Sequence, residues 1–473
     1  MLVAYSAIAK PAFDNWIRVD TKDLSFTTNL TPQTAQELAQ NLLEYMSFSE
    51  AFLPRREGYS IPLRLIVFSE KADFDEIVRP GKFASFTHSD IGGVLIVAAP
   101  SSSKYDDLLD NLKHELSHYQ MRHSAVNYPL WYEEGMATML SNANLAISEN
   151  SLTAEFKTPK PSARFPINQT TKPIRQTWLV QHLKRRHLNN LNLRIIHNFY
   201  NDSHRMAHLF HFNTSEDTRF SLKSLNGYFQ NQSDSLFSVL NITPRDLMNA
   251  LQTHQSVMKT PQLLALPAPE KNVQISISNI SEPEALKLMS IAASTTNPQG
   301  AIEHLLEATS QNQSDVLSML ELAKLYASTN RNRKSAHFLS KAKTLDLENP
   351  KVRTTEASML IRSCSPSNNR CSKYWRTAGT LIREALESEP GNIEAIYSLG
   401  VVELYSGRPG TALNYLKIAE EHAPWSPRIN FHLGEALRLL GDPAGIAYLI
   451  KARNWSNSDV WRNLAEKSIS EYR

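Results

Sequence analysis

The sequence has 473 residues, of which 41% are hydrophobic, and a formal net charge of +3. This length and composition predict two or three domains with buried cores. The near-neutral charge gives no reason to expect a nucleic-acid partner, and no apolar segment approaches the roughly 18 residues of a transmembrane helix.

Residues 1–9 are mostly small and apolar and end in Ala7-Ile8-Ala9, an A-x-A-like cleavage pattern. They predict the remainder of a signal peptide, although a basic n-region is missing. The alternative is an apolar first strand. The first interpretation makes the protein exported, periplasmic or secreted, and the alternative leaves it cytoplasmic.

Residues 10–101 predict an α+β lobe, because strand-like segments such as Leu63–Phe68 alternate there with an amphipathic helix near 32–47. Residues 102–260 predict a helical lobe. A polar, proline-containing stretch near 152–173 interrupts the helical pattern and predicts a loop over or beside the cleft.

The most informative motif is the HExxH run formed by His114, Glu115 and His118. A strand-like segment, residues 92–100, precedes it, and apolar residues recur through it at helical spacing. On a helix, residues four apart lie on one face, so both imidazoles can bind one ion while Glu115 faces the vacant coordination position. The run therefore predicts a helical zinc site.

A second segment supplies the missing ligand, since Trp131, Glu134, Gly135 and Ala137 follow the HExxH run after a short gap. Catalytic zinc normally takes three protein ligands and leaves the fourth position to water. Glu134 is therefore the predicted third ligand, and one zinc ion per chain is the expected cofactor.

The strand, the HExxH helix and this P-x-W-x-x-EG-x-A segment together resemble the gluzincin zinc peptidases, most closely the peptidase-MA-like group. The resemblance implies that His114, His118 and Glu134 bind the zinc and that Glu115 is the general base. It also implies that this part of the chain is an α+β zincin-like (thermolysin-like) peptidase domain, with its cleft between two lobes.

Two further expectations follow from the resemblance. Residues 93–98 would be the edge strand to which an extended peptide substrate adds, with a simple core strand as the alternative. Thermolysins carry an Asp four residues after the ligand Glu, where this chain has Thr138. The carboxylate that should orient a ligand histidine is therefore unassigned.

A zinc site of this kind cleaves peptide bonds with water. Zinc lowers the pKa of bound water to about 7 and polarises the scissile carbonyl, while a carboxylate, here Glu115, takes the water proton and passes it to the leaving amine. Gluzincins usually add a Tyr or His from a downstream helix to stabilise the oxyanion. The candidates lie on one predicted His-rich helix: Tyr200, His204, His208 and His211.

Residues 261–281 contain three prolines and a Ser/Asn-rich run and predict an interdomain linker. In residues 282–473, small residues recur at about the 34-residue period of tetratricopeptide (TPR) repeats, with one longer interval. The aligned positions are Ala308, Ala342, Ala385, Ala419 and Ala452. This segment resembles a TPR array, an all-α solenoid with a groove for peptides or protein surfaces. Structural docking onto the peptidase domain is the alternative.

Cys364 and Cys371 are the two cysteines of the sequence and flank a turn-rich loop within the longer interval. The loop predicts an insertion between the two helices of one repeat. A local disulfide there would fit an oxidising compartment. The alternative is a pair of free thiols in a cytosolic protein.

The sequence thus favours an exported zinc metallopeptidase, an endopeptidase rather than an exopeptidase, whose repeats recruit a protein substrate or partner. Two alternatives stay open. One is a catalytically silent, peptidase-like scaffold that acts through its repeats. The other is a zinc hydrolase of a non-peptide bond.

Overall fold

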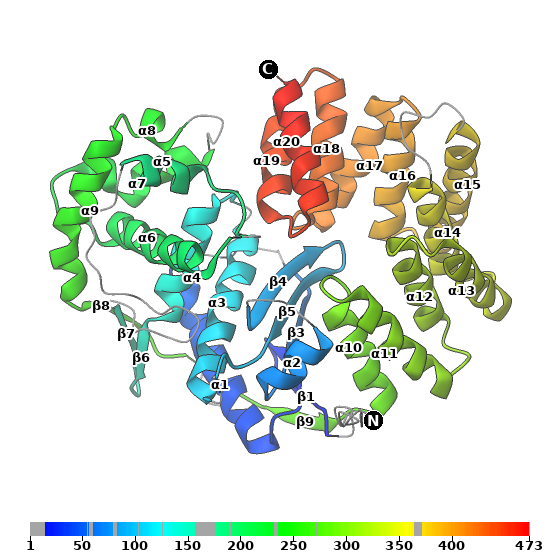
Figure 1. Ribbon diagram of the computed structural model, residues 1–473, viewed down its shortest axis with the longest axis horizontal. Helices are drawn as coiled ribbons and strands as arrows, with labels where there is room; N and C mark the ends of the chain where they lie inside the picture. The colour runs from blue at the N-terminus through cyan, green and yellow to red at the C-terminus, as the bar shows by residue number, and fades with distance from the viewer. Residues whose placement is uncertain are drawn as a thin grey trace, which may run out of the picture.

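The structure is a computed structural model in which an α/β part is followed by an array of helix pairs (Figure 1). The described residues are 15–53, 55, 60–78, 83–102, 104–124, 126–156, 176–188, 191–230, 235–269, 273–363 and 371–472. The predicted signal-peptide remainder, residues 1–9, lies outside these ranges.

A six-stranded mixed sheet forms the centre of the α/β part, in the order β4-β5-β3-β2-β1-β9. Its strands are β1 (Ile17–Asp20), β2 (Ser25–Thr28), β3 (Leu63–Val67), β4 (Ser85–Asp90), β5 (Gly93–Ala98) and β9 (Ser276–Asn279). β3 is parallel to β2 and β5, while β1, β4 and β9 run antiparallel to their neighbours.

Residues 93–98 form the internal strand β5, which pairs with β4 on one side and β3 on the other. The edge position implied by the resemblance is therefore wrong for this segment, and the core-strand alternative is confirmed. The physical reason is a hairpin: β4 turns back at Ile91 and Gly92, with Asp90 opposite Gly93, so β4 takes the edge.

Alternate residues of β3 and β5 are buried on opposite faces of the sheet, as the pleat requires. The helices that cover it are α1 (Pro32–Ser49), α2 (Lys71–Ile77), α3 (Tyr105–His123) and α10 (Glu282–Ala293). Leu65 and Val67 share a core with α1 and α3, whereas Ile66 and Phe68 share the opposite core with α2 and α10. The helix predicted near residues 32–47 is α1.

The rest of the α/β part is mainly helical and carries a second, three-stranded antiparallel sheet in the order β6-β7-β8. Its helices are α4 (Leu130–Ser141), α5 (Gln176–Lys184), α6 (Leu193–Phe212), the 3-10 helix η1 (Thr218–Phe220), α7 (Leu222–Gln230), α8 (Leu236–Val239) and α9 (Pro244–Lys259). Its strands are β6 (Asn144–Ile147), β7 (Ser151–Phe156) and β8 (Gln262–Pro267).

Two segments predicted as irregular contain strands. In the loop predicted near 152–173, the described residues 152–156 belong to β7, because Leu152, Ala154 and Phe156 alternate toward the core; residues 157–175 lie outside the described ranges. The predicted linker 261–281 contributes β8 to the small sheet and β9 to the large sheet.

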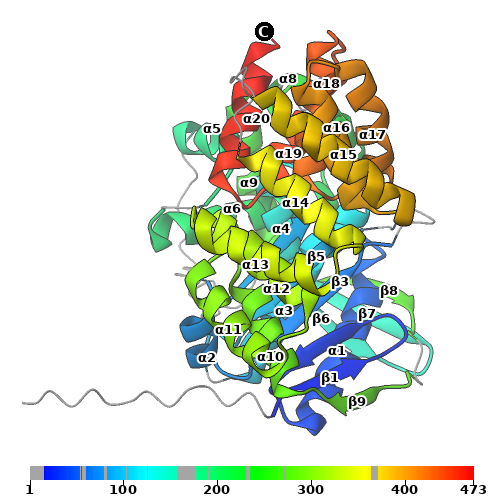
Figure 2. The same cartoon turned by 90° about the vertical axis from the view of Figure 1, so that its right-hand side faces the viewer.

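Residues beyond β9 form antiparallel helix pairs stacked in chain order (Figure 2). After α10 come α11 (Pro298–Gln311), α12 (Val316–Ser328), α13 (Asn332–Leu345), α14 (Pro350–Arg362), α15 (Ser372–Ser388), α16 (Ile393–Tyr405), α17 (Pro409–His422), α18 (Pro427–Leu439), α19 (Gly445–Trp455) and α20 (Asp459–Glu471). Each pair joins an even-numbered helix to the next odd-numbered one, and α20 packs on α19.

The predicted repeat is confirmed, because each aligned alanine lies near the end of the second helix of a pair, in α11, α13, α15, α17 and α19. All five alanines are fully buried. The extra residues of the longer interval separate α14 from α15, the two helices of one pair. Cys371 is buried and disulfide-bonded; Cys364 lies outside the described residues.

The array curves around the α/β part and contacts it near both of its ends (Figure 1). Near its beginning, α10 packs on the large sheet. Near its other end, the indole of Trp425 donates to the Asp90 carbonyl over 2.8 Å, Arg428 binds the Asp90 carboxylate at 2.8 and 2.9 Å, and Asn457 donates its side-chain amide to the Thr87 carbonyl. The array therefore covers part of the edge strand β4.

Gly135 allows α4 to lie directly against α6. A Cβ atom at this position would lie 2.3 Å from the Ser203 carbonyl oxygen and 3.1 Å from the Ala207 Cβ. Since backbone cannot yield as a flexible side chain does, any larger residue would push the two helices apart. Gly135 directly follows Glu134, so this contact also places the predicted zinc ligand.

We expect Gly135→Ala to lower the free energy of unfolding. The overpacking penalty of about 1–3 kcal/mol exceeds the gain of up to about 1 kcal/mol from replacing glycine in a helix. Urea denaturation followed by circular dichroism measures this change. Gly227→Ala in α7 is the matched control, because nothing lies within 4 Å of the added Cβ and only the helix gain applies. Equal stability of the two variants would contradict the expectation.

Candidate metal centre

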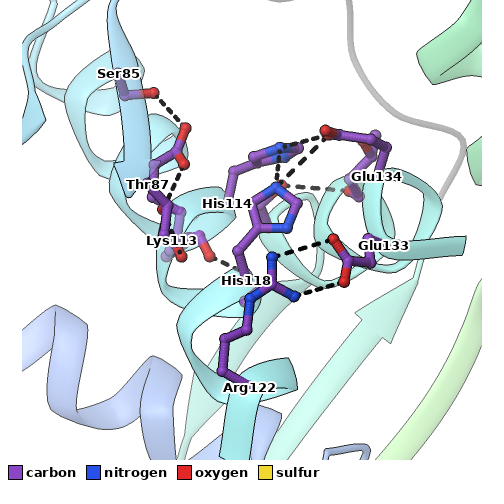
Figure 3. Close-up of polar contacts among 12 residues, drawn as sticks. Ser85, Thr87, Lys113, His114, His118, Arg122, Glu133 and Glu134 are labelled. Atoms are coloured by element: carbon purple, nitrogen blue, oxygen red, sulfur yellow. Dashed lines mark hydrogen bonds and ion pairs between the residues drawn. The ribbon is translucent and has the colours of Figure 1, made fainter. Parts of the chain in front are cut away.

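Helices α3 and α4 bring the three predicted ligands together (Figure 3). His114 Nε2 lies 3.1 Å from Glu134 Oε2 and 3.2 Å from His118 Nε2, and His118 Nε2 lies 3.6 Å from Glu134 Oε2. All three residues are buried. In the described part of the chain they form one group that could hold a metal ion.

The spacing of the donors fits zinc. With zinc–nitrogen bonds of about 2.0–2.1 Å in a tetrahedron, two imidazole nitrogens lie about 3.3 Å apart. The His114 and His118 Nε2 atoms, 3.2 Å apart, already have this separation. Two nitrogens and one carboxylate oxygen form the ligand set of catalytic zinc sites that leave a fourth position open.

The charges of the three side chains are strongly coupled. Burial alone would raise the pKa of Glu134, but the charge of His118 and the hydrogen bonds from both histidines hold this pKa well below its usual range. Burial alone would lower the pKa of His118, but the charge of Glu134 and its hydrogen bond raise it. The carboxylate is therefore held in the ionised form that a metal ligand requires.

Glu115, the predicted base, is held by two hydroxyl groups of the edge strand. Ser85 Oγ donates to Oε1 and Thr87 Oγ1 donates to Oε2, each over 2.7 Å. Ser85 and Thr87 point to the same face of β4 because they are two residues apart. Figure 3 shows both on one side of the histidine pair, with Glu134 on the other side.

The oxyanion candidates on α6 lie in different surroundings. The ring of Tyr200 contacts that of His114 edge-on, with centroids 5.9 Å apart. His208 Nδ1 lies 2.8 Å from His254 Nε2, and His211 Nε2 lies 3.0 Å from the Tyr132 hydroxyl. Tyr200 is thus the candidate that contacts a residue of the metal-binding group, while His208 and His211 bind partners outside that group.

Burial keeps the other histidines of this region uncharged at neutral pH. It lowers the pKa of His204 and of His208 to about 3 and that of His211 to about 4. His204, the remaining candidate, is buried and its ring contacts His208 at a centroid distance of 5.9 Å. A neutral imidazole in this interior fills core volume as an aromatic side chain does.

Sequence reasoning missed Ser85 and Thr87, and it gave no role to Glu133, which directly precedes Glu134. Glu133 pairs with Arg122 of α3 in a buried ion pair, with Nη1 and Oε1 2.5 Å apart. Thr138, at the position where thermolysins carry an Asp, is also buried. The spacing of Ser85 and Thr87, two residues apart in a strand, indicates that they share one face of it. Nothing in the sequence shows that this face meets Glu115.

No protein-family model matches this sequence, and no curated protein matches it. The C-terminal part matches solved structures of TPR proteins. A thermophilic TPR protein of Thermus thermophilus is 15% identical, with a TM-score of 0.35 over 40% of this chain and 99% of that chain. PilF of Pseudomonas aeruginosa is 17% identical, with a TM-score of 0.31 over 40% of this chain and 88% of that chain.

The TPR protein YrrB, whose structure is described as having an unusual peptide-binding site, is 14% identical, with a TM-score of 0.26 over 39% of this chain and 91% of that chain. Likenesses this distant carry no inference about function. What identifies the C-terminal part as a helical repeat is the chain's own series of helix pairs. In the described ranges, no helix has both the length and the apolar character needed to cross a membrane.

We expect the purified protein to bind about one zinc ion per chain and Glu134→Ala to lose it. Removal of a ligand should weaken binding by more than the roughly 10- to 100-fold typical of outer-shell changes. Metal analysis after gel filtration, followed by titration against a chelator, measures both. The control is His187→Ala, which removes an exposed histidine. Zinc-free protein after supplementation would contradict the metal centre.

We expect the free energy of unfolding to fall as the pH is lowered from about 6.5 toward 3. The pKa of His204 is about 3 in the folded chain, below its unfolded value of about 6.5, so in this window the unfolded chain binds one more proton. Each such histidine contributes a slope of up to ~1.4 kcal/mol per pH unit.

His204→Phe should reduce this slope, because the aromatic volume is kept and the titrating group is removed. Urea denaturation at several pH values, with a chelator present so that zinc release does not contribute, gives the slope. His187→Ala again serves as the control, since that histidine is exposed. An unchanged slope in His204→Phe would contradict the expectation.

Proposed function

We propose that this protein is a zinc-dependent hydrolase that cleaves peptide bonds, with zinc bound by His114, His118 and Glu134. The observation that carries the proposal is the convergence of these three buried donor atoms, with Glu115 following His114 in the same helix. A site that only bound metal would not need a carboxylate there. The intact Glu115 therefore favours hydrolysis over a catalytically silent scaffold.

Bound zinc would supply a Lewis acid that polarises a carbonyl oxygen and lowers the pKa of water to about 7. Glu115 would act as the general base: it takes a proton from the attacking water and delivers it to the leaving nitrogen. The hydrogen bonds from Ser85 and Thr87 fix the orientation of this carboxylate. Burial of Glu115 limits competing solvent around it.

Tyr200 is the proposed donor to the oxyanion that forms when water attacks the carbonyl. Its ring lies beside that of His114, and its phenol is the kind of donor that stabilises such a charge in a dry site. The edge-on contact and the burial of Tyr200 support this role. His208 and His211 were also candidates, but they bind His254 and Tyr132, which are not members of the metal-binding group, and this favours Tyr200 over them.

We assign the α/β part to the zincin-like, gluzincin class as part of the same proposal. The order of strand β5, helix α3 and helix α4, with the ligands in the two helices, supports this assignment. The proposed location is outside the cytoplasm, periplasmic or secreted. The disulfide-bonded state of Cys371 supports it, because such bonds persist in oxidising compartments.

The repeat array is proposed to bind a protein substrate or partner, since stacked helix pairs present an extended surface. Part of the array has a second role that needs no partner. It packs on the sheet through α10 and on β4 through Trp425 and Arg428, so the structural-docking alternative holds at both ends.

We expect Glu115→Gln to keep one zinc ion per chain and to abolish turnover, with a loss of at least about 10²–10⁴-fold from the missing general base. Digestion of an unfolded-protein peptide mixture, read by mass spectrometry with and without chelator, measures the loss. Turnover that survives in Glu115→Gln would exclude this mechanism. If wild-type protein binds zinc but cleaves only non-peptide esters or amides, the peptidase assignment is wrong.

Thr87→Val extends this test, because it keeps the shape of the side chain and removes one hydroxyl from Glu115. Loss of such an outer-shell partner typically costs about 10- to 100-fold in activity. Thr87→Ser retains the hydroxyl and is the matched control.

A further inference from the structure

A buried ion pair links the two helices that carry the metal ligands. Arg122 Nη1 lies 2.5 Å from Glu133 Oε1, and Nη2 lies 3.4 Å from Oε2, so the contact is bidentate (Figure 3). Arg122 is one helical turn beyond His118, and Glu133 directly precedes Glu134. The pair therefore joins α3 to α4 within one helical turn of His118 and directly beside Glu134 in the sequence.

The C-terminal array covers this ion pair. The Trp455 ring, from the end of α19, lies 4.7 Å from the Arg122 guanidinium carbon, and Lys451 Nζ lies 4.6 Å from the centroid of the same ring. Trp455 is 2% exposed and Arg122 is 7% exposed. A guanidinium over an indole face is an attractive contact that strengthens when water is excluded.

The neighbouring residue of the array binds the connection between the two helices. The Asn454 side-chain amide donates to Asn127 Oδ1 over 2.9 Å and to the Tyr128 carbonyl over 3.4 Å. Both acceptors lie between the end of α3 and the start of α4. The end of α19 thus contacts the ion pair and the connection that together determine how α4 lies on α3.

We propose that Arg122, Glu133 and Trp455 are positioning residues of the metal centre, so that the docked array completes the zinc site. This inference rests on the proposed zinc function. The bidentate pair fixes the rotation of α4 about its axis, and this rotation determines whether Glu134 faces the two histidines. A buried ion pair adds little net stability, but its fork-to-carboxylate geometry is specific. Trp455 keeps water from the guanidinium.

The test measures zinc affinity by chelator competition in wild type, Arg122→Lys and Trp455→Leu. Arg122→Lys keeps the charge and removes the bidentate fork, and Trp455→Leu removes the indole face. Each should weaken zinc binding about 10- to 100-fold, as outer-shell changes do. The visible absorption spectrum of the cobalt-substituted protein should also change, because it reports the coordination geometry directly. A purely structural role would leave that spectrum unaltered.

Two controls separate positioning from general loss of stability. Trp375→Leu removes a buried tryptophan in α15, within the array's own core, and Arg438→Lys alters a bidentate pair with Glu435 inside α18. Both should keep wild-type zinc affinity and cobalt spectrum. If Trp455→Leu does not fold, Trp455→Met replaces it, since its flexible side chain fills the site and still removes the aromatic face.

The outcomes distinguish the two levels of the proposal. If wild-type protein binds no zinc, the proposed metal centre itself fails. If wild type binds one zinc and Arg122→Lys and the Trp455 variant match its affinity and cobalt spectrum, the positioning role is overturned. It is also overturned if Trp375→Leu weakens zinc binding as much as the Trp455 variant does.

Discussion

The contact between α3 and α4 is the constraint on which the site depends. α3 supplies two imidazoles one turn apart, and α4 supplies the carboxylate that faces them. An α-helix turns by about 100° per residue, so a slip of α4 by one residue would turn Glu134 away from the histidines. Almost all of α4 is buried, and its packing against α3 and α6 leaves it one orientation. Gly135 permits the approach to α6, and the ion pair of Arg122 with Glu133 sets the rotation.

The local part of the site could be predicted because its geometry is a property of one helix. Residues four apart share a face whatever the rest of the fold does, so His114 and His118 were found from spacing alone. Glu134 followed from the number of ligands that zinc needs. The repeat was found for a similar reason: the second helix of each pair buries a small residue, and the regular spacing of these residues can be seen in the sequence.

The missed features all require knowing where distant segments meet. Ser85 and Thr87 act on a residue about thirty positions later, and their spacing says only that they share a strand face. The segment that holds β8 and β9 was predicted as a linker because it contains three prolines and a Ser/Asn-rich run, yet β9 pairs with β1. Residues 93–98 were predicted as a strand, and they form one. The hairpin that this strand makes with β4 places it inside the sheet, which its own residues do not indicate. On α6 the sequence contains several side chains that could donate to an oxyanion. Tyr200 is distinguished from the histidines only by its contact with His114 in the folded chain.

The pairing of β9 with β1 has a consequence for modularity. In the sequence, β9 lies directly before the repeats, but its hydrogen bonds make it an edge strand of the large sheet. A chain ended between β9 and α10 would uncover part of the apolar sheet face that holds Ile66 and Phe68, and one ended before β9 would also expose the main-chain edge of β1. Exposed edges and faces of this kind promote aggregation. The repeats of this protein are therefore not an exchangeable attachment, and any exchange of them would have to preserve a strand and a helix that belong to the sheet.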